Sequence, residues 1–163
     1  MNLLVITAAV IMSATMNTAQ EEKTDFYHNT EIENNHIVAQ YIYKKVAVPY
    51  ENKVYQMLEP HRMYDYNYDA EERLSVRTSH HWNGQQWGPE SRLEYTYADD
   101  GYSVSISYWD KNKQRFSSPM YKTVYTEMPD RTAVQICNYQ RCGKDWVQTT
   151  QLLAPSVQGT LQS

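Results

Sequence analysis

The sequence predicts an all-β protein: an antiparallel up-and-down meander of three to four repeated β-hairpins, in a single sheet that is twisted or curled on itself. Three observations predict this fold. Several segments alternate apolar and polar residues with the period of two that marks a strand with one buried face. Asn-Gly and Asp-Gly pairs, which suit two-residue hairpin turns, separate these segments. The 163 residues include 15 Tyr and 4 Trp but only 2 Phe, so amphipathic aromatic side chains must supply most of the core.

The amino-terminal element is an apolar run, Leu3 to Met12, within an uncharged stretch that ends at Ala19. A run of about 10 residues is too short to span a bilayer, which requires about 20, but it suits the apolar segment of a secretory signal. We therefore expect residues 1–19 to be a signal peptide, although its start lacks the usual Lys or Arg, and residues 20–35 to be a polar linker. The alternative is an amino-terminal strand or helix that belongs to the core. No transmembrane segment is expected after signal removal.

The clearest strands lie in the middle and last thirds of the chain. Residues 63–68 alternate with three tyrosines on one face, and residues 103–108 alternate small polar and apolar side chains strictly. Residues 133–138 keep the same phase. Turn-forming residues separate the strands at Asn83-Gly84, Asp100-Gly101, Asp110-Lys111-Asn112 and Asp130-Arg131.

These strands belong to units that repeat along the chain. Tyr95-Thr96-Tyr97 aligns with Tyr125-Thr126-Glu127, and the same shift places Trp109 on Tyr139 and Phe116 on Trp146. An earlier and weaker copy contains Trp82 and Trp87. Because a fixed period marks a repeated supersecondary unit, we expect a β-hairpin repeat domain over residues 36–153 and a flexible tail over residues 154–163.

The two cysteines, Cys137 and Cys142, have a spacing that can bridge the two arms of a hairpin near its turn. A disulfide closing so small a loop would stabilise the fold by about 2 kcal/mol, and two free thiols are the alternative. A zinc site is not expected, because zinc needs four ligands and no second Cys or His pair has a suitable spacing.

Residues 61–116 resemble the repeated core of a family of uncharacterised, small, secreted Tyr/Trp-rich β-repeat proteins from gut Bacteroides and relatives. The shared pattern is Tyr-x-Tyr-Asp, a turn, a strand that ends in Trp-Asp or Trp-Asn, and a second aromatic residue. The resemblance extends over roughly residues 36–150 and implies an exported all-β protein of a Gram-negative anaerobe, either secreted or held in the periplasm or cell envelope. It implies no catalytic residues. The last unit departs from the pattern at Glu127 and Tyr139, so its hairpin is either specialised or a cap.

The sequence contains no motif that indicates catalysis. A phosphate-binding glycine loop, a nucleophile elbow and an HExxH helix are all missing. Adjacent residues on a strand point to opposite faces, so His80 and His81 are not expected to share a metal. The carboxylate pairs Glu71-Glu72 and Asp99-Asp100 stand at expected turns. We expect no enzymatic activity, cofactor or metal. A net charge of −4 without a block of Lys and Arg also argues against a nucleic-acid partner.

The repeated aromatic residues are the candidate binding site. Rings that face solvent in a row can bind sugars or a partner protein, whereas rings that pack between neighbouring hairpins form the repeat's own core. We therefore expect an exported, non-enzymatic protein that binds a glycan or a host or envelope protein. The rival hypothesis is a structural or protein-interaction component of the cell envelope that acts through sheet-edge pairing. The candidate ligand-binding residues are Trp82, Trp87, Trp109, Tyr139 and Trp146.

Overall fold

The structure, a computed structural model, describes residues 3–8, 25–130 and 132–155. These residues form strands and turns without a helix, and so no helix among them is long and apolar enough to cross a membrane. The strands are β1 (Leu3–Ala8), β2 (Phe26–Glu33), β3 (His36–Tyr50), β4 (Lys53–Tyr68), β5 (Leu74–Trp82), β6 (Trp87–Ala98), β7 (Gly101–Asp110), β8 (Arg115–Phe116), β9 (Tyr121–Glu127), β10 (Ala133–Cys142) and β11 (Asp145–Pro155).

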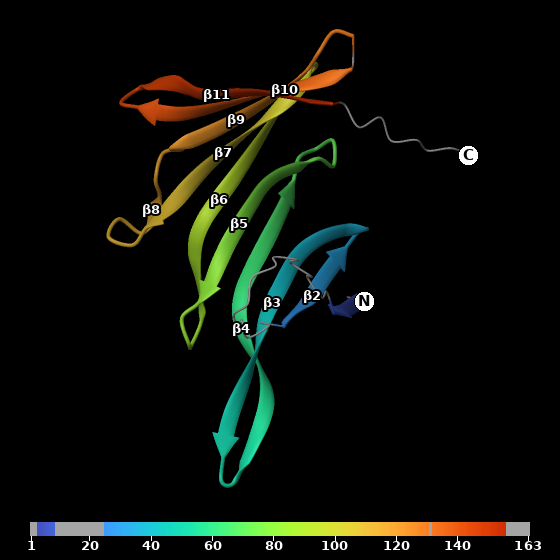
Figure 1. Ribbon diagram of the computed structural model, residues 1–163, viewed down its shortest axis with the longest axis vertical. Coiled ribbons are helices and arrows are strands. Elements are labelled where there is room, and N and C mark those ends of the chain that lie inside the picture. Colours follow the sequence, from blue (N-terminus) through green and yellow to red (C-terminus); the bar gives the residue numbers. More distant parts are fainter. Residues whose placement is uncertain (1–2, 9–24, 131, 156–163) are drawn as a thin grey trace, which may run out of the picture. The chain divides into compact units, whose positions relative to one another are not determined.

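The strand order confirms the predicted meander. Strands follow one another in chain order from β1 to β11, except that the short β8 pairs with β7 beside this path and β9 is the next strand along it (Figure 1). The sheet is open, and its pairings are antiparallel. The strands gather into two compact units, Met1–Asn67 with Thr78–Glu90 and Tyr68–Arg77 with Ser91–Ser163.

The first unit contains a strand, β2, that the sequence did not predict. β2 pairs with β3 from Phe26 opposite Lys44 to Glu33 opposite His36, around a turn at Asn34 and Asn35. Both turn residues have positive φ, 48° and 67°, as a tight hairpin turn requires. The segment expected as a linker, 20–35, therefore contains a strand, and the described sheet extends to the amino-terminal side of residue 36.

The segment expected as a signal peptide contains β1, which pairs with β2 along its whole length. Residues 1–2 and 9–19 of that segment lie outside the described residues, and so do residues 20–24. Removal of the segment on export therefore stays a prediction. At the other end, β11 continues to Pro155, beyond the expected start of the tail at residue 154, while residues 156–163 lie outside the described part of the chain.

The outer half of the β3–β4 hairpin extends past its neighbours as a two-stranded ribbon (Figure 1). We call residues 45–59 the β3–β4 arm. Within it, β3 and β4 pair from Lys45 opposite Leu58 to Tyr50 opposite Lys53. The pairing of β2 with β3 ends at Lys44, and the final contact is a backbone hydrogen bond of 3.1 Å from Lys45 to Asp25.

In the second unit, β6, β7, β9, β10 and β11 pair in sequence with nearly regular registers. One irregularity between Asn138 and Tyr139 interrupts the pairing of β10 with β11. Residues directly opposite each other on paired strands share a face, so the register places Tyr97, Tyr102 and Tyr125 in one row across three strands. Tyr95 and Tyr121 lie on the same face, and we call the face that carries these five rings the tyrosine face.

The core is thin in both units. Among the described residues, Ala39 and Cys137 are the buried hydrophobic side chains, and Thr78, Ser79 and Ser107 are buried polar ones. No large side chain of this part of the chain is fully buried. The aromatic side chains of this part of the chain are therefore at least partly exposed.

Candidate functional site

Two of the predicted tryptophans close the β5–β6 hairpin in the first unit. The rings of Trp82 and Trp87 meet edge to face with centroids 5.1 Å apart. Between them, the side-chain oxygen of Asn83 accepts hydrogen bonds of 2.9 Å from the backbone of Gln85 and of Gln86. Such a bond from the first turn residue fixes the turn, so the ring pair forms at the turn as a consequence of local geometry.

Trp109 forms an equivalent pair in the second unit. It meets Phe116 edge to face at 5.0 Å, and the Asp110 carboxylate accepts hydrogen bonds from the backbone of Asn112 and Lys113 in the turn between them. The guanidinium of Arg92 lies 4.1 Å from the centroid of the Phe116 ring. These rings are therefore partly covered by their own hairpin and by a cation.

The last two predicted residues, Tyr139 and Trp146, lie on β10 and β11 and share one cation. The ammonium nitrogen of Lys122 is 5.3 Å from the Tyr139 ring centroid and 4.9 Å from that of Trp146. Thus the structure does not gather the predicted aromatic residues into one site. Each of them lies near an aromatic residue of the same hairpin or shares a cation with it, and each ring is half-buried.

A different set of aromatic residues surrounds one of the concave sites in the second unit. A groove of about 330 Å³ lies over the tyrosine face and is lined by Leu93, Tyr95, Tyr102, Val104, Ile106, Tyr121, Lys122, Thr123 and Tyr125. Its size falls near the lower end of ordinary ligand sites. The rings of Tyr102 and Tyr125 are stacked with centroids 4.6 Å apart, and 38% of Tyr102 and 43% of Tyr121 remain exposed.

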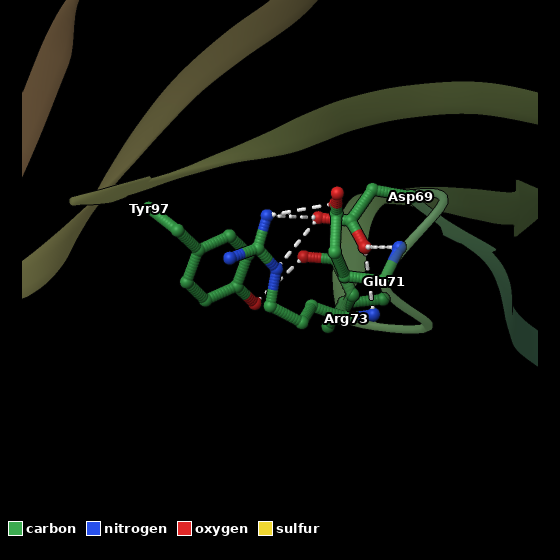
Figure 2. A network of polar contacts seen from close by, with 5 residues as sticks. Asp69, Glu71, Arg73 and Tyr97 are labelled. Carbon is green, nitrogen blue, oxygen red and sulfur yellow. Dashed lines mark hydrogen bonds and ion pairs between the residues drawn. The ribbon is translucent and has the colours of Figure 1, made fainter. Parts of the chain in front are cut away.

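The tyrosine row is anchored at the β4–β5 turn (Figure 2). The guanidinium of Arg73 lies 4.5 Å from the Tyr97 ring centroid, and the Tyr97 hydroxyl donates a 2.9 Å hydrogen bond to the Leu74 carbonyl. Arg73 is held in turn by carboxylates, at 2.8 Å from Asp69 and 3.1 Å from Glu71. Tyr97 is 6.1 Å from Tyr102, so this network fixes one end of the stacked row.

The environment of the tyrosine row favours uncharged phenols. Burial raises the pKa of Tyr102 above its ordinary value of 10.0, and the neighbouring Tyr125, Tyr95 and Tyr97 raise it further. The groove therefore offers partly exposed apolar rings, two of them stacked on each other, together with neutral hydroxyls that can donate and accept hydrogen bonds. This arrangement can bind an uncharged polar ligand with one apolar face.

Sequence reasoning missed the tyrosine face, although a signal for it was present. Tyr95 and Tyr97 alternate with polar residues, and the repeat aligned them with Tyr125 and Glu127. The face that Tyr102 and Tyr121 share with them depends on the register between strands, which the sequence did not supply.

Cys137 and Cys142 are both free, with Cys137 buried and Cys142 exposed. The prediction that they bridge two arms of a hairpin is wrong in its premise, because both residues belong to β10 and the turn follows Cys142. Five residue steps along an extended strand separate their Cα atoms by roughly 16 Å, whereas a disulfide requires about 4.4–6.8 Å.

The remaining polar candidates have structural partners. His80 Nε2 lies 2.7 Å from Asp65, while the ring of His81 faces Gly88, so the two histidines diverge as expected for neighbours on a strand. The carboxylate pairs Glu71-Glu72 and Asp99-Asp100 lie at turns. Within residues 25–130 and 132–155, no group of three or more His, Cys, Asp and Glu side chains is placed to hold a metal ion.

Comparison with known proteins identifies uncharacterised relatives. A model of a family of unknown function, DUF3836, matches residues 1–127. A solved structure of a protein of unknown function from Bacteroides fragilis NCTC 9343 is similar, with 25% identity and a TM-score of 0.67, over 81% of this chain and 94% of that one. A DUF3836 family protein from Parabacteroides distasonis ATCC 8503 has 19% identity and a TM-score of 0.49, over 82% and 92% of the two chains. No curated protein matches the chain.

Proposed function

The chain belongs to the DUF3836 family of unknown function, and we propose that it is an exported, non-enzymatic protein that binds a glycan on the tyrosine face. The observation that carries this proposal is the groove over β6, β7 and β9, in which phenol rings lie partly exposed and side by side. Sugar rings combine a flat apolar face with hydroxyls. A phenol offers the matching combination of ring face and hydroxyl.

The anchoring of the groove supports a binding role. The cross-strand row from Tyr97 through Tyr102 to Tyr125 is held by the Arg73 cluster at one end, so the rings are ordered before any ligand arrives. Preordered rings lose little conformational entropy on binding. The half-exposed Tyr102 and Tyr121 give a ligand direct access to this surface.

Export is supported by the amino terminus and by the relatives. The apolar run from Leu3 to Met12 has the length and the polar flank of a secretory signal. The similar protein from Bacteroides fragilis supports an origin in a Gram-negative bacterium of this kind. We therefore propose that the mature protein acts in the cell envelope or outside the cell, where polysaccharides and mucin-type glycans are accessible.

The test is binding of mature protein to an array of immobilised mucin O-glycans and bacterial capsular polysaccharides. Tyr102→Ala should weaken binding at least about tenfold, as expected for a central aromatic anchor, and Tyr102→Phe separates ring stacking from hydrogen bonding. Tyr108→Ala is the matched control, because Tyr108 also lies on β7 with 43% exposure but does not line the groove. Equal binding by all three variants, or no binding by the unsubstituted protein, would contradict the proposal.

A second candidate function is sheet-edge pairing with another envelope protein. Of the described strands, only β10 pairs with β11, and β11 exposes Val147, Leu152 and Leu153 by 48%, 58% and 65%. Exposed edges of this kind can accept an added strand. Amide hydrogen exchange in β11 tests the idea: envelope extract should slow exchange there, and Leu153→Lys should abolish this protection. Rapid exchange under all conditions would exclude the edge as an interface.

A further inference from the structure

We infer that the β3–β4 arm is a self-association surface, on which two copies of the chain pair antiparallel along the outer edge of β4 from Lys53 to Glu59. This inference concerns the first unit only. It does not rest on the tyrosine face, and it goes beyond the proposed glycan binding.

The arm has two free edges among the described strands. On the β3 side, β2 ends its pairing at Lys44. On the β4 side, β5 has nine residues and follows the turn over residues 69–73, so its antiparallel pairing with β4 can extend only to about residue 60. The backbone groups on the outer edge of β4 from Lys53 to Glu59 therefore have no strand beside them among the described residues.

Proline distinguishes the two edges. Pro49 lies on the β3 strand of the arm, where it removes one backbone donor, and edge prolines discourage strand addition. The facing segment of β4, residues 53–59, contains no proline. Strand addition to the arm should therefore occur on β4.

The side chains of the arm are too apolar and too exposed for a stable solitary hairpin. A two-stranded ribbon is at best marginally stable in water without further packing. The exposed apolar side chains of the arm are Tyr50, Val54, Tyr55, Met57 and Leu58, which are 64%, 66%, 48%, 54% and 51% exposed. Because alternate residues of a strand point to opposite faces, a second copy paired along β4 would bring these side chains beside their counterparts on each face of the ribbon.

The charge pattern of β4 selects a second copy in antiparallel orientation. Lys53, Tyr55, Met57 and Glu59 alternate on one face of β4. Antiparallel pairing about Gln56 would place Lys53 opposite Glu59 of the other copy, and Tyr55 opposite its Met57. The two-fold symmetry of such a dimer would create two Lys53–Glu59 pairs, one at each end of the paired segment. In-register parallel pairing would instead place like charges opposite each other. Within the described residues, no ion pair forms at Lys53 or Glu59, and the residue opposite Glu59 on β3 is Lys44.

Cysteine cross-linking tests the pairing directly. In a Cys142→Ser background, which removes the exposed thiol, Gln56→Cys should form a disulfide-linked dimer under mild oxidation, because residue 56 would face its own copy. Ala47→Cys is the matched control: Ala47 lies opposite Gln56 on β3, so its copy would be three strand spacings away, about 14 Å. Equal cross-linking at both positions, or none at residue 56, would overturn the inference.

Charge reversal tests the register. Lys53→Glu and Glu59→Lys should each weaken dimerisation about tenfold, because every dimer would then contain two like-charged pairs, and the double variant should restore it. Sedimentation equilibrium measures the dissociation constants, and circular dichroism confirms that each variant is folded. A monomer at all concentrations, or a double variant no better than the single ones, would refute the pairing. Glycan binding by the tyrosine face can survive either result.

Discussion

Tyrosine suits the half-exposed positions of this sheet, because its ring and its hydroxyl make different stabilising contacts. The ring of Tyr97 contacts Tyr102 and lies beneath the guanidinium of Arg73, while its hydroxyl donates to a backbone carbonyl. In the first unit, the hydroxyl of Tyr66 donates to the Gln40 side chain at 3.2 Å. An aliphatic residue would supply the apolar contact alone. At a half-exposed position this contact buries little apolar surface and so stabilises the fold less than a tyrosine does.

Gly101 carries a steric requirement at the start of β7. A Cβ atom at this position would overlap the backbone carbonyl oxygen of Tyr125 on β9. We expect Gly101→Ala to destabilise the protein by about 1–3 kcal/mol, the usual cost of forcing extra volume into a packed site, as measured by urea denaturation.

Gly88→Ala is the control for Gly101→Ala. The nearest atoms to a Cβ at Gly88 would belong to the His81 side chain, at an ordinary contact distance of 3.4 Å. Both variants add one Cβ atom to a glycine. A loss of stability in Gly88→Ala equal to that in Gly101→Ala would therefore contradict the steric explanation.

At the scale of the element, the repeated Trp-Asn and Trp-Asp pairs have a local cause. In both β5–β6 and β7–β8, the tryptophan is the last or the next-to-last residue of its strand and meets a second aromatic ring across the turn. The following Asn83 or Asp110 accepts backbone hydrogen bonds within that turn. The repeated motif is therefore a hairpin closure, which accounts for its recurrence without a ligand.

The β4–β5 turn should make stability depend on acidic pH. Desolvation acts to raise the pKa of Asp69, but hydrogen bonds from Arg73 and from the Glu71 backbone hold it below the usual 3.8. A lowered folded-state pKa means that the carboxylate stabilises the fold above the unfolded pKa, and that this contribution is lost as pH falls through the folded pKa. We expect the melting temperature to decrease as the pH is lowered past about 4. The decrease should be smaller in Asp69→Asn.

Asp99→Asn, in the β6–β7 turn, is the control for this pH dependence. It removes a carboxylate from a neighbouring turn without touching the Arg73 cluster. Parallel melting curves for Asp69→Asn and the unsubstituted protein between pH 2 and 6 would show that the Asp69 network contributes nothing to the acid response.

The elements that could be predicted from sequence are those whose signal is local. Alternation located β7 and β10, and Asn83-Gly84 located a turn, because both depend on neighbouring residues. The expected Asp100-Gly101 turn is shifted by one residue, since Gly101 begins β7. The tyrosine groove and the separation of Cys137 from Cys142 depend on pairing and strand length, which local patterns do not encode. β2 was missed because its polar composition resembled that of a linker.

At the scale of the whole molecule, the composition and the fold explain each other. An open meander offers few positions that are covered on both sides, and in the described residues the buried hydrophobic side chains are both small, Ala39 and Cys137. Long-chain aliphatic residues would gain little from such a fold. Stability must instead come from cross-strand pairs of the kind seen between Tyr102 and Tyr125.

This shallow burial also determines how the protein should respond to temperature. The heat capacity increment of unfolding arises mainly from newly hydrated apolar surface, and compact domains show about 12–15 cal/mol/K per residue. With no large side chain of the described residues fully buried, we expect a value below that range, as measured by scanning calorimetry of dilute protein. A value within it would contradict this account. A small heat capacity increment flattens the curve of stability against temperature. The free energy of unfolding should therefore vary only slowly with temperature.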